Sequence, residues 1–458
     1  VIVSERAMRE IYLKGFEIIV KESQPWTIMS SYNKVNGTYT SESRDLMTGV
    51  LRDDWGFEGL VMSDWFGGND AAAMVGAGND LLEPGTRKQW KALLEAHKNG
   101  YLNIEDIDTS VKRILKLVFE SKKMQNYRYG NNPDLTAHAK ISRLAGAEGM
   151  VLLKNENSLP IQKSKNVALL GVTSYDFITG GTGSGDVNEA YIVSLEEGLK
   201  NAGYQINATA KDIFENHKEA NSKEFVRPEG IKAMFTPYIP PQIVYTSEQL
   251  HQIATESDLA IITIGRNAGE GGDRVEKDDF LLSHQEQDMI ANTCVAFHEA
   301  GKKVVVVLNI GGVIETNSWK EQPDAILLAW QGGQEGGNAA ADILSGKINP
   351  SGKLPMTFPI NLDDHASNKN FPQDGEPLKI TDMLFTGEVD EEDRVQNRDF
   401  TIYEEGIYVG YRHFDKVSSE VSYPFGFGLS YTDFEFSDLA VAVENDSINM
   451  QLTVKNTG

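Results

Sequence analysis

The chain has 458 residues, a hydrophobic content of 40% and a formal net charge of −24 at pH 7. This acidic balance argues against nucleic acid and anionic membrane surfaces as partners, and no apolar run approaches the ~20 residues that span a bilayer. The one cysteine, Cys294, cannot form an internal disulfide, so we expect it to be a small buried hydrophobe.

Residues 1–122 alternate between strand and helix patterns. Strands are predicted at 26–32, 60–64 and 80–83, and helices at 4–22, 44–53, 70–75, 86–98 and 104–122. Three strands are too few to close a (β/α)8 barrel. We therefore expect this portion to be the C-terminal part of such a barrel, with its earlier strands preceding Val1.

A polar linker is predicted at 123–135, and an α/β sandwich domain at 136–400. Its expected strands are 167–172, 259–265, 303–309 and 325–330, and its expected helices are 136–154, 194–201, 283–300 and 336–344. The strands are apolar throughout, which is typical of a parallel sheet covered on both faces. Ser283 and Glu286 form a capping-box pattern at the start of one helix.

The sequence pattern changes in the C-terminal part of the chain. Residues 361–398 are polar, with an acidic run at 388–393 that lacks the spacing of a calcium loop, so we expect a solvated loop. A connecting segment is predicted at 401–430. From 431 to 458 the apolar residues alternate, which predicts the hairpin that begins an all-β domain.

Two carboxylates stand out as candidates for chemistry. Asp64 ends the apolar segment Leu60-Val-Met-Ser and precedes Trp65, a position at the carboxyl end of a strand that favours catalysis. Glu270 lies in a loop between glycines, with Asp273 and Glu276 as neighbours that could take the same role. Hydrolysis of a glycosidic bond commonly requires two carboxyl groups in different surroundings.

Six segments occur in the order typical of one enzyme family. They are Met29-Ser-Ser-Tyr-Asn-Lys-Val-Asn-Gly37, Leu51-Arg-Asp-Asp-Trp-Gly-Phe-Glu-Gly59, Val61-Met-Ser-Asp-Trp65, Leu152-Leu-Lys-Asn-Glu156, Asn349-Pro-Ser-Gly-Lys-Leu-Pro355 and Tyr423-Pro-Phe-Gly-Phe-Gly-Leu-Ser-Tyr431. Over nearly all its length the chain resembles glycoside hydrolase family 3 β-glucosidases. The resemblance implies a barrel, an α/β sandwich and a fibronectin type III-like domain, of which 431–458 would be the start.

The resemblance also implies roles for individual residues. Asp64 matches the nucleophile and Glu270 the acid/base, while Trp65, Tyr32, Met29 and Ser184 match substrate-binding positions. The sugar-gripping Lys-His pair of the family belongs to barrel segments that would precede Val1. The sequence therefore predicts a retaining exo-acting β-glucosidase, and the isolated fragment is expected to be inactive.

Three alternatives stay open: a β-xylosidase, N-acetylglucosaminidase or other exo-β-glycosidase, a non-catalytic carbohydrate-binding protein, and a nucleotide-binding protein suggested by the glycines at 180–185. The partners expected are small-molecule β-glucosides or oligosaccharides, without nucleic acid or membrane, and a homodimer is left open. No metal or other cofactor is expected, because the histidines lack metal-ligand spacing. The compartment, cytoplasmic or secreted, is undetermined.

Overall fold

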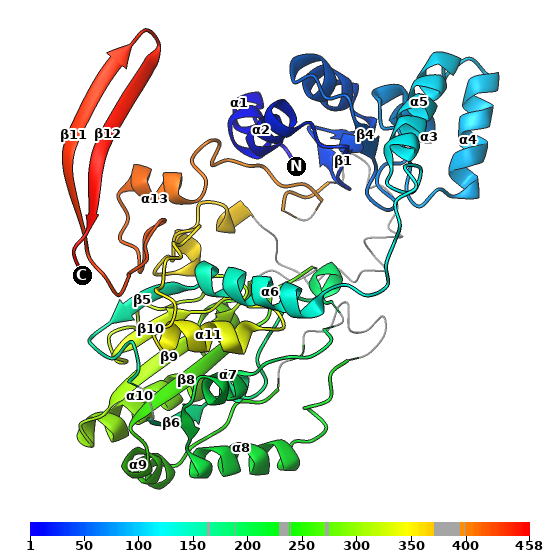
Figure 1. Cartoon of the computed structure of the whole chain (residues 1–458). Helices are drawn as coiled ribbons and strands as arrows, with labels where there is room; N and C mark the ends of the chain where they lie inside the picture. Colours follow the sequence, from blue (N-terminus) through cyan, green and yellow to red (C-terminus); the bar gives the residue numbers. More distant parts are fainter. Residues whose placement is uncertain are drawn as a thin grey trace. The chain divides into compact units, whose positions relative to one another are not determined.

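The computed structural model of the chain describes residues 1–162, 165–187, 189–228, 238, 240–270, 274–370, 394–397 and 399–458. These residues form two compact units (Figure 1). The first unit consists of Val1–Asn132 and His365–Val417, and the second of Pro133–Asp364 and Ser418–Gly458. The acidic run at 388–393 lies outside the described residues.

Two short parallel strands lie at the centre of the first unit. β1 (Thr27–Met29) pairs with β4 (Leu60–Met62), and Leu81 continues beside Met62 as a single bridge. Leu60 and Val61 are buried, as expected for strands covered by helices. Two of the three strands predicted from the sequence are thus present in shortened form, while the third, predicted at 80–83, is reduced to the bridge at Leu81. The carboxyl ends of these segments lie at one edge.

The helices of the first unit follow the predicted apolar spacing. They are α1 (Glu5–Ala7), the π-helical η1 (Met8–Tyr12), α2 (Lys14–Ser23), the π-helical η3 (Asp45–Asp54), α3 (Ala71–Ala77), α4 (Arg87–Lys98) and α5 (Ile104–Glu120). Asp70 starts α3 by accepting from the backbone N–H groups of Ala72 and Ala73. Asp80 is buried and pairs with Arg52 and Arg113 at 2.8 Å each. Because Arg52 lies on η3 and Arg113 on α5, this cluster ties both helices to the sheet.

A late segment of the chain packs against the start of the first unit. Ile402 forms a parallel bridge with Ile2, and the hydroxyl of Tyr12 donates to Glu405 at 3.3 Å. The segment ends in α13 (Tyr411–Val417), while a small hairpin of β2 (Lys34–Val35) and β3 (Thr38–Tyr39) turns at Asn36 and Gly37.

The second unit contains a six-stranded mixed sheet in the order β5-β10-β9-β8-β6-β7 (Figure 1). Five strands run parallel and β5, at one edge, runs antiparallel to β10. The strands are β5 (Val151–Asn155), β6 (Asn166–Leu170), β7 (Gln205–Ile206), β8 (Leu259–Arg266), β9 (Lys303–Ile310) and β10 (Ala325–Leu328).

Both faces of this sheet are covered by helices. On one side α6 (Leu135–Gly149), α7 (Leu195–Asn201) and α11 (Gly336–Leu344) enclose a core that includes Val305 and Val307. On the other side α8 (Ala208–Ala220), α9 (Ser247–Glu256) and α10 (His284–Glu299) enclose a core that includes Val304 and Val306. Successive residues of β9 therefore point into different apolar layers, which explains why the strands are apolar throughout.

The structure corrects one boundary and adds elements in the second unit. The predicted helix 136–154 is wrong in its last turn, because α6 ends at Gly149 and Val151–Asn155 is a strand. An apolar run after a helix has no periodicity that separates the two states. The helices α8 and α9 and the short strand β7 were not predicted. Cys294 is buried as expected, and burial raises the pKa of its thiol to about 12.

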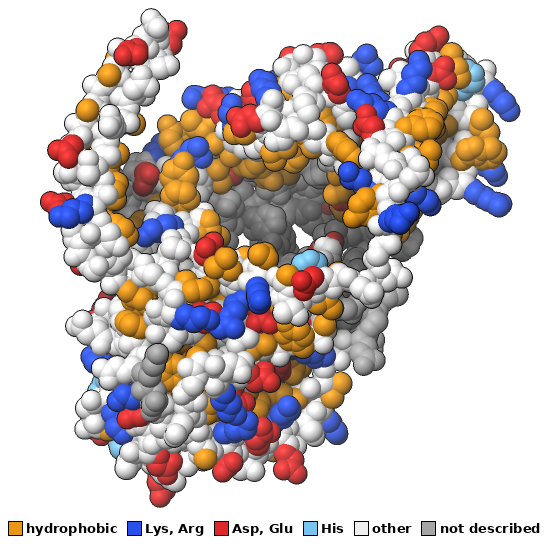
Figure 2. Space-filling model, in the orientation of Figure 1, with side chains coloured by type: hydrophobic (Ala, Val, Ile, Leu, Met, Phe, Trp, Pro, Cys, Tyr) orange, Lys and Arg blue, Asp and Glu red, His pale blue; other side chains and the backbone are white. Residues whose placement is uncertain are grey.

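The chain ends in the predicted hairpin, β11 (Phe434–Glu444) paired antiparallel with β12 (Ser447–Asn456). A bulge between Ser437 and Ala440, with Asp438 at φ 56°, shifts the alternation by one residue. The shift keeps the apolar side chains on one face, where Phe436 lies opposite Val454. These side chains are exposed, and apolar groups are visible along the hairpin in Figure 2.

Candidate active site

The first group of predicted site residues lies at the carboxyl ends of β1 and β4. Met29 ends β1 and Asp64 follows β4 by two residues. The backbone N–H of Asp64 donates to the carbonyl of Ser30 at 3.2 Å, so the two strand ends remain joined beyond the sheet. Asp64 is half-buried, whereas Trp65, Met29 and Tyr32 are 58%, 55% and 48% exposed. The first unit thus presents one carboxylate next to a set of exposed apolar and aromatic groups.

The local hydrogen bonds fix the backbone around Asp64. Its Oδ1 accepts from the backbone N–H of Trp65 at 2.7 Å, and its carbonyl accepts from Gly67 at 3.1 Å. Phe66 has a φ of 63° and its N–H donates to the carbonyl of Glu83, at the end of the third strand segment. A sharp turn after the strand therefore presents the carboxylate at the sheet edge.

The second group lies in the second unit, where two loops meet. The backbone N–H of Ser184 donates to Oε2 of Glu270 at 3.0 Å, although 86 residues separate them in sequence. A parallel bridge joins Thr182 and Gly269, and the N–H of Glu270 donates to the carbonyl of Thr182 at 3.3 Å. The structure therefore brings Ser184 and Glu270 together, as neighbours on loops that follow β6 and β8.

Glycines make this close approach of the two loops feasible. A Cβ on Gly183 would lie 2.4 Å from Cβ of Glu270, and a Cβ on Gly269 would lie 2.2 Å from the backbone nitrogen of Thr182. The Ser184 backbone N–H, followed by the Ser184 hydroxyl, holds the pKa of Glu270 below its ordinary value. Of the two neighbours considered in its place, Asp273 lies outside the described residues and Glu276 is exposed.

Comparison with known proteins identifies the family of the chain. Residues 1–117 match the glycosyl hydrolase family 3 N terminal domain and residues 150–411 match the family 3 C-terminal domain. The chain belongs to glycosyl hydrolase family 3. The resemblance drawn from the six sequence segments is thereby confirmed.

Similar family 3 proteins have known activities or structures. The chain is 36% identical to thermostable beta-glucosidase B of Acetivibrio thermocellus, over 100% of this chain and 55% of the relative. It is 31% identical to exo-alpha-(1->6)-L-arabinopyranosidase of Bifidobacterium longum, over 99% of this chain and 55% of the relative. The structure of beta-glucosidase 3B from Thermotoga neapolitana in complex with glucose is 43% identical, with a TM-score of 0.88 over 100% of this chain and 62% of that one. The chain thus spans about half the length of the curated relatives named here and has a family 3 β-glucosidase-like fold with mixed α/β sheets.

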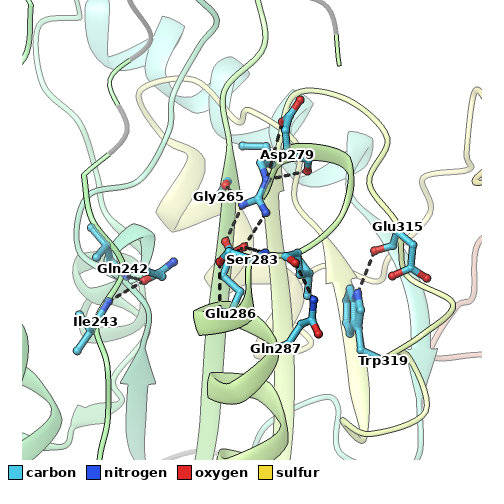
Figure 3. A network of polar contacts seen from close by, with 12 residues as sticks. Gln242, Ile243, Gly265, Asp279, Ser283, Glu286, Gln287, Glu315 and Trp319 are labelled. Carbon is cyan, nitrogen blue, oxygen red and sulfur yellow. Dashed lines mark hydrogen bonds and ion pairs between the residues drawn. The ribbon is translucent and has the colours of Figure 1, made fainter. Parts of the chain in front are cut away.

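An ion-pair network anchors the loop that carries Glu270, and sequence reasoning missed it. Arg266, the last residue of β8, donates to both carboxylate oxygens of Glu286 at 2.6 and 2.7 Å (Figure 3). Its Nε donates to the carbonyl of Asp279 at 2.9 Å. Glu286 also accepts from the backbone N–H and the hydroxyl of Ser283, which confirms the predicted capping box. Both ends of the loop are therefore tied to α10.

A second missed residue is Asn309, near the end of β9. Its side chain accepts from the N–H of Ile178 at 2.7 Å and donates to the carbonyls of Ile178 and Trp330 at 2.9 and 2.8 Å. It is fully buried. In the sequence, Arg266 and Asn309 could both have been recognised as polar residues at the carboxyl end of an otherwise apolar strand.

Metal and membrane features were also sought in the structure. Within the described ranges, no group of three or more His, Cys, Asp and Glu side chains is arranged to hold a metal ion. None of the described helices combines the length and the apolar character needed to cross a membrane.

Proposed function

We propose that the protein is a glycoside hydrolase acting as a retaining, exo-acting β-glucosidase that removes terminal β-D-glucosyl residues. The observation that carries the proposal is the position of Asp64, at the carboxyl end of β4 beside the exposed Trp65, in a family 3 chain. The 43% identity to a β-glucosidase solved with glucose supports a glucoside substrate.

The proposed chemistry is a double displacement. Asp64 attacks the anomeric carbon and forms a glycosyl ester while Glu270 gives its proton to the departing oxygen. Glu270 then takes a proton from water, which attacks the same carbon and releases the sugar and the Asp64 carboxylate. In this mechanism the two carboxyl groups are about 5–5.5 Å apart when the enzyme is competent.

The remaining site residues have binding roles in this proposal. The indole of Trp65 stacks on a sugar face, Tyr32 and Met29 line the glucosyl pocket, and Ser184 contacts the sugar from the second unit. The substrates are small β-glucosides or oligosaccharides. We further propose that β1, β4 and the Leu81 segment are strands of a (β/α)8 barrel and that β11 and β12 belong to a fibronectin type III-like domain.

Covalent labelling tests the nucleophile. A 2-deoxy-2-fluoroglucoside traps a glycosyl ester when the second step is slow, and mass spectrometry of peptides locates it. In the full-length protein we expect the label on Asp64, none in Asp64→Ala, and unchanged labelling in the control Asp53→Asn, whose side chain is exposed. A label that persists in Asp64→Ala would assign another nucleophile, and an unlabelled but sugar-binding protein would favour a non-catalytic carbohydrate-binding function.

A second candidate is an exo-acting glycosidase for another sugar. The 31% identity to an exo-alpha-(1->6)-L-arabinopyranosidase covers 99% of this chain, and the 36% identity to a beta-glucosidase covers 100%. Comparing kcat/KM on aryl β-D-glucoside and aryl α-L-arabinopyranoside decides between them. The β-glucosidase proposal expects the glucoside to be the better substrate.

A further inference from the structure

The loop that follows Asp64 in the first unit contains two residues in the left-handed region of the backbone. Phe66 has a φ of 63° and Gly68 a φ of 82°. Glycine adopts this conformation freely, whereas a bulky residue such as phenylalanine does so only when its surroundings hold it there. The contacts that hold this loop therefore also determine where the Asp64 carboxylate and the Trp65 indole lie.

A carboxylate from another segment of the first unit holds the far end of the loop. Oε1 of Glu42 accepts from the backbone N–H groups of Asn69 at 2.5 Å and Asp70 at 2.8 Å. Hydrogen bonds of this kind, with a charged acceptor, are about twice as strong as those between neutral groups. Gly68 packs closely against the same segment, because a Cβ there would lie 3.1 Å from Oε1 of Glu42 and 2.5 Å from Oγ of Ser41.

Glu42 belongs to a short 3-10 helix, η2 (Thr40–Glu42), which also contacts the loop after β1. The hydroxyl of Thr40 donates to the carbonyl of Ser31 at 2.7 Å, and its oxygen accepts from the backbone N–H of Ser31 at 3.0 Å. Ser31 directly precedes Tyr32, one of the predicted substrate-binding residues. One turn of three residues therefore joins the loop after β1 to the loop after β4.

The helix that follows the loop has a cap of its own. Asp70 starts α3 by accepting from the backbone N–H groups of Ala72 and Ala73 at 2.8 and 3.2 Å. The two N–H groups that Glu42 binds belong to residues 69 and 70, which precede the first residue of α3. The contacts of Glu42 therefore hold the loop rather than start the helix.

We propose that Glu42 is a positioning residue for the glycosidase reaction. It holds the end of the loop so that the Asp64 carboxylate meets the anomeric carbon in one orientation, and it does not itself contact the substrate. Misplacement of a reacting group by about 1 Å can cost about a hundredfold in rate. This inference rests on the proposed function and adds to it a residue that acts through the nucleophile.

The rate of covalent labelling of the full-length protein tests the inference. The reagent is 2,4-dinitrophenyl 2-deoxy-2-fluoro-β-glucoside, whose leaving group departs without protonation, so the rate measures attack by Asp64 and not proton donation. In Glu42→Ala we expect the labelling rate at saturating reagent to fall at least about tenfold, with the label still on Asp64. Glu42→Gln keeps an oxygen that accepts from both N–H groups and should recover the rate to within about threefold.

Two controls separate positioning from a loss of stability. The final extent of labelling counts the folded molecules, so a variant that only unfolds loses extent and keeps its rate. Asp134→Ala removes a carboxylate that caps α6 in the second unit and should leave the rate unchanged. Gly68→Ala pushes the loop away from η2 and should slow labelling as Glu42→Ala does. Gly76→Ala is its matched control, because nothing lies within 4 Å of the added Cβ.

A measurement without substrate follows the loop directly. In the full-length protein labelled with 5-fluorotryptophan, the 19F NMR resonance of Trp65 is identified by its loss in Trp65→Phe. We expect this resonance to shift or broaden in Glu42→Ala and Gly68→Ala and to stay in place in Glu42→Gln and Gly76→Ala.

Three results would overturn the inference: an unchanged labelling rate in Glu42→Ala, an equal loss of rate in Asp134→Ala, or an unmoved Trp65 resonance in Glu42→Ala. Failure of the proposed function is distinguishable from these. The unsubstituted protein would then carry no label on Asp64, while the Trp65 resonance would still respond to Glu42→Ala.

Discussion

The two carboxylates of the proposed mechanism have different hydrogen-bond partners. Asp64 accepts from the N–H of the residue that follows it, at 2.7 Å, whereas Glu270 accepts from Ser184 on a distant loop, at 3.0 Å. A nucleophile must be ionised and a general acid must be protonated. Donation from Ser184 lowers the pKa of Glu270, and in the proposed mechanism the pKa of Glu270 sets the alkaline limit of the first step.

Removing the Ser184 hydroxyl should raise the pKa of Glu270. In Ser184→Ala the backbone N–H, the larger cause of the lowered pKa, is retained, so the value stays below the ordinary one. The protonated acid is lost as the pH rises through this pKa, so the alkaline limb of kcat/KM in the full-length protein moves to higher pH. NMR titration of the Glu270 carboxyl carbon measures the pKa. Ser184→Thr keeps the hydroxyl and is the control; an unchanged pKa in Ser184→Ala would contradict the prediction.

Substituting Gly183 should disrupt the contact between Ser184 and Glu270. An alanine there would place Cβ 2.4 Å from Cβ of Glu270, at a φ of +68°. The left-handed conformation alone costs about 1–2 kcal/mol in a residue other than glycine. We expect the pKa of Glu270 to rise more in Gly183→Ala than in Ser184→Ala, by the same titration. Gly185→Ala is the matched control, because nothing lies within 4 Å of its added Cβ.

At the scale of elements, the carboxyl ends of strands position every predicted site residue except Ser184, which lies in the short 3-10 helix Gly183–Gly185. The apolar runs and the capping box at Ser283 predicted most of the strands and helices of the second unit. Sequence could not give the end of α6, since the run 150–153 suits helix or strand equally. It also could not show that Arg266 reaches Glu286, because a contact between a strand end and a helix depends on packing.

Arg266 should contribute strongly to the stability of the second unit. Arg266→Met leaves the buried Glu286 carboxylate without its cation, which costs about 3–5 kcal/mol in the free energy of unfolding. The double variant Arg266→Met/Glu286→Met should recover part of that loss. Urea unfolding monitored by Trp319 and Trp330 fluorescence measures both.

The control for this prediction is a partly exposed ion pair in the same unit. Lys165 and Asp258 are 3.5 Å apart, with side chains 39% and 41% exposed. Lys165→Met should cost less than about 1 kcal/mol. Equal losses in Lys165→Met and Arg266→Met would contradict a special role for Arg266.

At the scale of the whole molecule, the chain forms two units, with one proposed catalytic carboxylate in each. The family and the general fold could be predicted from six sequence segments, because each is a local pattern. The domain boundaries and the roles of Asp64, Glu270, Trp65, Tyr32, Met29 and Ser184 stay predictions. They depend on contacts between residues that are far apart in the sequence, which local patterns do not encode.

The isolated 458-residue chain should hydrolyse an aryl β-glucoside poorly. Trp65, Met29 and Tyr32 are about half exposed, whereas a competent sugar pocket encloses most of its ligand. We expect a kcat/KM at least about a hundredfold below that of the full-length protein, a difference of about 2.7 kcal/mol in transition-state binding. Comparable turnover by the two proteins would contradict this.

The bridge between Thr182 and Gly269 couples the motions of two loops in the second unit. It joins the loop that carries Ser184 to the loop that carries Glu270, so the two loops cannot move independently of one another. In the proposed mechanism, a motion that brings Ser184 toward a bound glucoside therefore brings Glu270 with it.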